Sequence, residues 1–288
     1  MTDRPARVVD AHVHIWDPAR TDWYPYLAHP PKGGPGDSSR MFRKFDVETY
    51  RSESSGWNVE KFINVAAATG PNSVDETIEL DRDSESNGGP DAIVGGLPPA
   101  ESTADAIALL DRQMAASRFR GVRPMGPMDN PVPAPEVLRA LADRDLVFEL
   151  MTHPDQLRSA AQRLSRFDDL SIVVEHTGWP RSNTDQELTL WKEGIDALAD
   201  LGENVTCKLS GLAMPLGSLK EEDLGPWLGY AIEAFGTDRC MFASNFPVDA
   251  TAGTFDELYE TFSSVTSGLD AEARERLFAS NAERIYRF

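Results

Sequence analysis

The sequence is short of cysteine, of positive charge and of long apolar runs. Its 2 Cys residues, Cys207 and Cys240, lie in apolar runs typical of strands, which predicts buried reduced thiols and no disulfide framework. Lys and Arg number 28 against 47 Asp and Glu, and the net charge of -19 argues against a nucleic acid as partner. No run of about 18 apolar residues occurs and the first residues are polar, so we expect neither a membrane span nor a signal peptide. These absences predict a cytoplasmic protein.

The rest of the composition is that of a globular chain. Hydrophobic residues make up 41% and charged residues 26% of the 288 residues. This length suits one barrel of alternating strands and helices. Because no linker and no repeat longer than one strand and helix divides the chain, we expect residues 1–288 to form a single domain.

Eight short apolar runs bounded by turn residues predict eight strands. They are Val8–His14, Phe62–Ala67, Ala92–Leu97, Phe119–Pro124, Leu146–Met151, Ser171–His176, Val205–Leu209 and Arg239–Ala243. Helical periodicity separates most of them, for example over Ala104–Ser117 and from Pro154 or Asp155 to Arg166, and a last helix is expected over Ala271–Arg287. This alternation predicts an α/β fold with parallel strands, a single (β/α)8 TIM barrel, with a doubly wound open sheet as the alternative.

One segment departs from the alternation. Residues 15–57 contain Trp23-Tyr24-Pro25-Tyr26 and a Pro- and Gly-rich stretch at 30–36, without a clear helical period. A loop of this length after the first strand is usually functional, and in a barrel it emerges at the end that carries the active site. We therefore predict that its aromatic residues roof the pocket. The alternative is packing against a second copy of the chain in a homo-oligomer.

The histidines supply the strongest local signal. Of 5 His, four follow or end predicted strands, whereas His29 lies in the long loop and is expected to be solvated. His12 and His14 are two residues apart, so both imidazoles project to one side of a strand, as two ligands of one ion do. His153 follows the fifth strand and His176 ends the sixth. Since strand ends of a barrel converge on one mouth, we predict that these four share a pocket.

Several short motifs occur in order along the chain. They read Val-Val-Asp-Ala-His-Val-His-Ile-Trp-Asp at residues 8–17, Glu-His-Thr-Gly-Trp-Pro at 175–180, Lys-Leu-Ser-Gly-Leu at 208–212, Met-Phe-Ala-Ser-Asn-Phe-Pro-Val-Asp at 241–249 and Asn-Ala-Glu-Arg-Ile-Tyr at 281–286. With these motifs the sequence resembles the amidohydrolase-2 family of the amidohydrolase superfamily. The nearest branch is that of 2-pyrone-4,6-dicarboxylate lactonase and the L-fucono- and L-rhamnono-lactonases.

The resemblance implies a barrel enzyme that opens the ring of a sugar-acid or aromatic-acid lactone with water. Decarboxylases of the wider family bind zinc through histidines that match His12, His14 and His153, and they use in catalysis the one that matches His176. The resemblance thus implies one divalent metal ion, zinc first. The dicarboxylate lactonase works without a metal, so a metal-free mechanism is the alternative.

The sequence departs from the family pattern at the eighth strand. Asn245 stands where the family usually has an Asp that binds metal or takes a proton. An amide has no useful basicity near neutral pH, so we predict that Asn245 is not the general base and that it either offers a weak carbonyl ligand to a metal or orients substrate. Asp249, or a metal ion that activates water, then does that work. The alternative for Asp249 is a helix cap or a solvated loop acid.

Arg123 and Lys208 are the cations best placed to bind an anionic small molecule. Either could instead be a structural ion-pair partner. We predict that an activated water attacks a lactone carbonyl while His176 or a metal ion stabilises the oxyanion. Two other functions remain open, a lyase or isomerase acting on a carboxylated substrate and a ligand-binding barrel without turnover.

Overall fold

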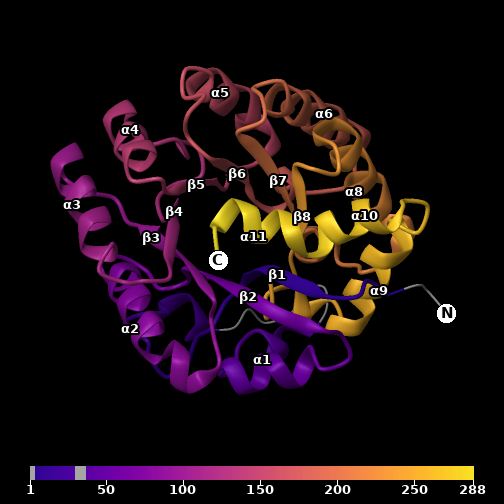
Figure 1. Ribbon diagram of the computed structural model, residues 1–288, viewed down its shortest axis with the longest axis horizontal. Coiled ribbons are helices and arrows are strands. Elements are labelled where there is room, and N and C mark those ends of the chain that lie inside the picture. Colours follow the sequence, from indigo (N-terminus) through magenta and orange to yellow (C-terminus); the bar gives the residue numbers. More distant parts are fainter. Residues whose placement is uncertain (1–3, 30–36) are drawn as a thin grey trace.

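Eight parallel strands form the centre of the molecule, and helices surround them (Figure 1). The structure, a computed structural model, describes residues 4–29 and 37–288. The strands are β1 (Val8–Val13), β2 (Val59–Val65), β3 (Ala92–Leu97), β4 (Phe119–Pro124), β5 (Val147–Leu150), β6 (Ile172–Val174), β7 (Val205–Leu209) and β8 (Cys240–Phe242). Each strand pairs with the next, and a bridge between Val13 and Phe246 joins the β8 end to β1. The predicted barrel is confirmed.

The helices follow the strands in the expected alternation. They are α1 (Val47–Glu53), α2 (Asn72–Asn87), α3 (Thr103–Gln113), α4 (Pro135–Asp143), α5 (Pro154–Leu164), α6 (Asp185–Ala199), α7 (Ala213–Leu216), α8 (Glu221–Phe235), α9 (Phe255–Val265), α10 (Ala271–Glu275) and α11 (Asn281–Tyr286). Ser102 caps α3 by accepting a bond from the amide of Asp105. The expected C-terminal helix is present and runs without interruption from α10 into α11, with the π-helical turn Arg276–Ser280 between them. No helix among the described residues is long and apolar enough to cross a membrane.

In its described part, the long segment after β1 contains one α-helix and two short 3-10 turns that its sequence did not reveal. The expectation of a loop without helix was wrong for α1, where Asp46 accepts the Thr49 amide and the buried Val47 and Tyr50 form one short apolar face. Only these two residues of the helix are buried, too few for a visible period. The stretch 30–36 of the predicted loop lies outside the described residues.

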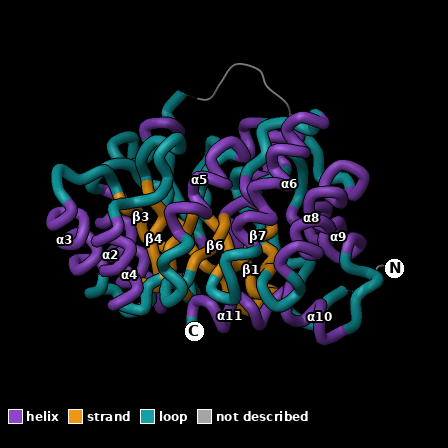
Figure 2. Tube along the Cα trace, turned by 90° about the horizontal axis from the view of Figure 1, so that it is seen from above, coloured by secondary structure: helices purple, strands orange, loops and turns teal. Residues whose placement is uncertain are grey.

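Two apolar layers position the strands. Alternate strand residues such as Cys207, Leu209 and Phe242 pack outward against the helices, and both cysteines are free and buried as predicted. A second cluster, of small inward residues from six strands, continues into α11 through Ile285 and Tyr286. Figure 2 shows α11 at one end of the strands.

This end is the floor of the barrel, the end at which the strands begin. Arg287, which follows α11, bonds to Asp145 just before β5, and its carbonyl accepts a bond from Arg120 near the start of β4. The opposite end carries the histidines that end or follow the strands.

Candidate active site

A β-bulge in β1 aims the predicted histidine pair into the barrel. Asp10 pairs with Phe62, and Val13 pairs with Asn64. Between these two pairs, β1 contains one residue more than β2. Ala11 belongs to the inner cluster and Val13 to the outer one. The bulge therefore changes the alternation, and His12 and His14 both face the interior although the preceding inward residue is Ala11.

The two imidazoles meet edge to face with their Nε2 atoms 3.2 Å apart. The Nδ1 atom of His14 donates to the carbonyl of Val65 at 2.8 Å, so the Nε2 atom of the neutral His14 ring carries a free lone pair. The Nδ1 atom of His12 is buried without a hydrogen-bond partner in the described part of the chain. Burial, reinforced by the charges of Lys208 and Arg123, lowers the pKa of both histidines well below the ordinary value, so both are neutral.

This pair fits a divalent cation. Two nitrogens that each lie about 2.1 Å from one tetrahedral ion are about 3.4 Å apart, close to the separation of the Nε2 atoms. Neutral imidazoles are also the protonation state that a metal needs.

His176 joins the pair from the turn after β6. Its ring lies 4.6 Å from that of His12, and its Nδ1 atom is 3.0 Å from the hydroxyl of Ser210. His176 has a φ of 52°, a left-handed conformation that holds the side chain over the strand end. The turn after β7 comes so close that a Cβ on Gly211 would lie 2.4 Å from the His176 ring. Burial lowers the pKa of His176 to about 3, so it acts as a neutral imidazole.

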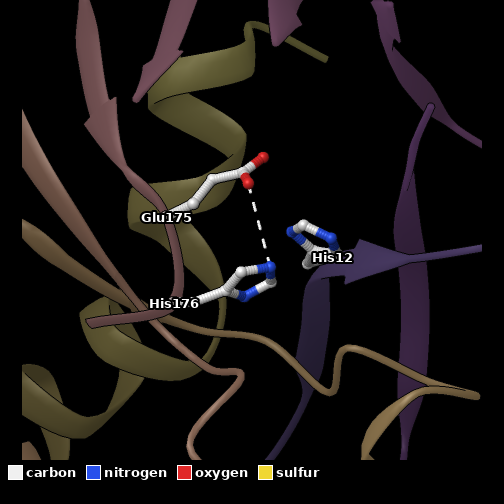
Figure 3. A group of neighbouring side chains, drawn as sticks. All are labelled: His12, Glu175 and His176. Atoms are coloured by element: carbon white, nitrogen blue, oxygen red, sulfur yellow. Dashed lines mark ion pairs between the residues drawn. The ribbon is translucent and has the colours of Figure 1, made fainter. Parts of the chain in front are cut away.

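Glu175 is a site residue that the sequence analysis missed. Ligand atoms of His12, Glu175 and His176 all lie within 4.8 Å of one another. Figure 3 shows their three side chains facing each other. The Glu175 carboxylate lies 3.8 Å from Nε2 of His176. Glu175 is fully buried, and its place directly before a strand-end histidine was the only available signal.

His153, the expected third metal ligand, is not part of this group. Its Nδ1 atom bonds to the carbonyl of Trp179 at 3.1 Å, and its ring packs against that indole at 5.1 Å. Trp179 also contacts His176, with the ring centroids 5.5 Å apart. The indole of Trp179 thus contacts both His153 and His176.

Arg123 projects from β4 into the same region. Its guanidinium is 3.4 Å from the Glu175 carboxylate and donates to the carbonyl of Ala66 at 2.6 Å. The Nε–H of Arg123 is buried and has no acceptor among the described residues. A buried donor of this kind can bind an oxygen of a substrate at little reorganisation cost.

Lys208 forms a buried ion pair. It is fully buried, and its ammonium lies 2.8 Å from both carboxylate oxygens of Glu149. This is the second of the two roles that its sequence allowed. Burial raises the pKa of Glu149 to about 8, against the opposing effect of Lys208.

Asn245 and Asp249 form one buried unit after β8. The Nδ2 atom of Asn245 donates to Asp249 at 3.0 Å, while its Oδ1 atom is buried and has no donor in the described structure. The Asp249 carboxylate also accepts the backbone amides of Gly211, Ala213 and Met214. Burial outweighs these bonds and raises the pKa of Asp249 to about 7.

Aromatic residues of the long segment cover part of the site. Trp16 stacks on His14 at a centroid distance of 5.5 Å, and Tyr26 packs against Trp16 and donates to the carbonyl of Ala67. Tyr24 instead turns into the protein and donates to the buried Glu76. The expected aromatic roof therefore consists of Trp16 and Tyr26.

A surface pocket of about 590 Å³ opens beside the ends of β3 and β4, away from the histidines. Its described lining residues include neither His, Cys nor Asp, and Arg163 in its wall bonds to Asn130 and to the carbonyl of Val132. We assign the chemistry to the histidine cluster.

Residues 9–288 match the family described as Amidohydrolase. The chain belongs to the amidohydrolase family. This membership agrees with the resemblance carried by the motifs, and it identifies the protein as an enzyme and, at the level of the family, as a hydrolase.

Three relatives of this amidohydrolase stand out. An L-fucono-1,5-lactonase of Burkholderia ambifaria is 29% identical over 97% of this chain and 95% of its own. A crystal structure of an amidohydrolase from Burkholderia multivorans with bound zinc has a TM-score of 0.81 at 24% identity, over 98% of this chain and 100% of its own. A 2-pyrone-4,6-dicarboxylic acid hydrolase from Pseudomonas putida, named as putative, has a TM-score of 0.70 at 18% identity, covering 97% of each chain. The two structural likenesses support the fold alone.

Proposed function

We propose that this amidohydrolase opens the ring of a lactone that carries a negatively charged group, by attack of water on the lactone carbonyl. The observation that carries the proposal is the cluster of three neutral imidazoles, His12, His14 and His176, beside the unpaired donor of Arg123. The similarity to an L-fucono-1,5-lactonase supports a sugar-acid lactone as the first substrate class to test.

We assign the metal site to His12 and His14, with zinc as the first candidate and His153 as a further ligand to be tested. The distance between the two Nε2 atoms and the neutral state of both rings support this assignment. A divalent ion bound there supplies a Lewis acid that polarises a carbonyl oxygen and makes water more acidic.

His176 polarises the carbonyl in this proposal. If the Ser210 hydroxyl donates to Nδ1, the proton of the neutral ring sits on Nε2. The nearest carboxylate oxygen is 3.8 Å from Nε2, too far for a hydrogen bond, so this N–H is available to a substrate oxygen. The lactone oxygen that gains negative charge then has a donor already in place.

Asp249 is the candidate for the group that takes the proton from water. A carboxylate with a pKa of about 7 suits a general base at neutral pH, and the amide of Asn245 cannot replace it. Accepting the proton breaks one of the four bonds that the carboxylate now receives. Arg123 binds the charged group of the substrate with its free Nε–H and fixes the orientation of the ring.

The test is a panel of sugar-acid and aromatic-acid lactones, each with and without a free carboxylate, assayed in ¹⁸O-labelled water. We expect ring opening with solvent oxygen in the new carboxylate, and a preference for the charged lactones. Release of carbon dioxide, or a product without label, would favour a lyase or isomerase. Tight binding of the panel without turnover would favour a ligand-binding barrel.

Metal content is measured on protein purified without a chelator. We expect about one equivalent of divalent ion, as a single site of this kind holds. Metal well below one equivalent together with activity unchanged by chelation would contradict the metal assignment and support the metal-free mechanism.

A further inference from the structure

A chain of fully buried polar side chains connects the C-terminal helix to the active site. Tyr286, in the last turn of α11, donates its hydroxyl to Glu149 in β5. Lys208 in β7 bonds to both oxygens of the same carboxyl at 2.8 Å, and its ammonium lies over the Tyr286 ring at 5.3 Å. All three side chains are 0% exposed. The floor of the barrel is therefore tied to its interior by charge as well as by packing.

The chain continues from Glu149 to the mouth. The carboxyls of Glu149 and Glu175 interact inside the barrel. Burial together with the neighbouring Glu175 raises the pKa of Glu149, whereas the Arg123 guanidinium lowers the pKa of Glu175. Glu175 in turn contacts Arg123 at 3.4 Å. Four strands or strand ends thus meet through side chains inside the barrel, and Arg123 is the last member and the one nearest to solvent.

The charges along this chain of buried side chains explain why Lys208 and Tyr286 are needed beside Glu149. Two carboxyls in contact cannot both be ionised in a buried site unless cations balance them. Lys208 and Tyr286 supply three donors to Glu149. Glu149 is therefore balanced by its own donors, and Glu175 is the carboxylate that contacts the Arg123 guanidinium. Without Lys208, Arg123 is the cation left to balance both carboxyls, so any negative charge on Glu149 also falls to the guanidinium, because a buried charge without a partner is strongly unfavourable.

We propose that Glu149, Lys208 and Tyr286 are positioning residues of the active site, which fix Arg123 in its substrate-binding orientation through Glu175. None of the three touches substrate. The substrate-binding role of Arg123 rests on the proposed function, whereas its orientation by this chain does not. The C-terminal residues are then part of the machinery of the site as well as a cover for the floor.

The test reads the orientation of Arg123 directly. The Nε–H of Arg123 is buried, so we expect a separate ¹⁵N–¹H signal that exchanges slowly with water and is absent in Arg123→Lys. In Lys208→Met and in Tyr286→Phe this signal should move or broaden. In the double variant Glu149→Gln with Lys208→Met the competing charge and its partner are both gone, so the signal should return close to its wild-type position.

The matched control is Lys61→Met. Lys61 also tethers α11, by bonding Glu283 at 2.8 Å, but it lies outside the chain of buried groups. The Arg123 signal should stay unchanged in this variant. If the signal is also unchanged in Lys208→Met and Tyr286→Phe while thermal stability falls, the three residues only stabilise the fold, and the proposal is wrong.

Kinetics on an active lactone form the second readout. For a carboxylate-bearing lactone, Lys208→Met should raise KM about 10-fold or more, as expected when a charge-assisted bond is misaligned, and the double variant should recover most of it. The neutral ester of the same lactone should show little change in KM. Equal changes for both lactones would overturn the proposal. If no lactone is turned over, the proposed function fails, and the Arg123 signal still decides the positioning role.

Discussion

Replacing Asp249 by Asn tests the unit behind β8 most sharply. The carboxylate accepts bonds from the Asn245 side chain and from the amides of Gly211, Ala213 and Met214. An Asn at this position keeps one oxygen and turns its own amide donors toward the remaining N–H groups. About two of the four donors then lose their acceptor, at about 1–3 kcal/mol each. We expect Asp249→Asn to lower the free energy of unfolding by about 2–6 kcal/mol.

The pH dependence of this loss has a definite sign. The pKa of Asp249 is about 7 in the folded protein, above the value of about 3.9 expected for an unfolded Asp. A raised carboxyl pKa contributes stability that is fully present below the unfolded pKa and is lost as pH rises through the folded pKa. Wild-type protein should thus gain about 2 kcal/mol from this group between about pH 8 and about pH 5.5, and the variant should not. The penalty of the substitution is therefore larger at the lower pH.

Urea unfolding at both pH values and initial rates on an active lactone measure the two consequences. Loss of a required base lowers turnover by roughly 10²–10⁴-fold, so kcat should fall by that factor in any preparation that is still folded. A penalty that is larger at about pH 8 would show that the four donors hold the carboxylate ionised, with a lowered pKa. Turnover near the wild-type rate in metal-depleted Asp249→Asn would rule out the base role.

Three further outcomes follow from the geometry. His14→Ala removes one Nε2 of the pair, and metal analysis should return well below the wild-type content, since a loss confined to activity would contradict the ligand role. Gly211→Ala places a Cβ 2.4 Å from the His176 ring at a residue whose φ is +68°. We expect kcat to fall while the circular dichroism spectrum remains that of a folded barrel. An unchanged kcat would show that the His176 ring can move away without loss of function. Arg123→Lys should raise KM for a charged lactone roughly 10–100-fold and leave its neutral ester nearly unaffected, and equal effects on both would contradict the anchoring role.

The sequence predicts the strands of this protein well because a parallel barrel buries each strand on both faces. Such strands are short, continuous apolar runs with abrupt ends, and β3, β4 and β7 have the predicted bounds. The prediction is weaker where a local contact decides the structure. Helix α1 depends on one cap at Asp46, and no residue type indicates the π turn inside the C-terminal helix.

The candidate site was predictable only in its histidines. Imidazoles at strand ends are rare enough in this chain to stand out, whereas the acids are numerous. Glu149 and Glu175 lie in apolar runs among 47 acidic residues, and only the barrel brings them together. The same argument applies to Lys208, whose two possible roles differ solely in what lies opposite it across the barrel. Long-range pairing of buried charges leaves no local pattern, so the structure was needed to find it.

Asn245→Asp restores the acid that the family usually carries at this position, and the structure explains what that change meets. Its side chain would face Asp249 at the 3.0 Å contact that Asn245 now makes, so two buried carboxyls would replace a donor and an acceptor.

One of the two must keep a proton, which raises its pKa above the unfolded value. Wild-type Asp249 already keeps its proton up to a pKa of about 7, so the variant should lose stability relative to wild type only as pH rises from about 7 toward the raised pKa of the pair. The loss should be up to about 1.4 kcal/mol per pH unit, because in that range the folded variant holds a proton that folded wild type has released. Turnover should stay within a modest factor of wild type or rise, since the pair still contains a group able to take a proton. Urea unfolding from about pH 6 to about pH 9 together with kcat over the same range measures both. A stability difference that does not vary with pH above about pH 7 would show that the two acids do not share a proton. By this argument Asn245 and Asp249 act as one unit, in which the amide allows a single buried acid to stand without a second charge beside it.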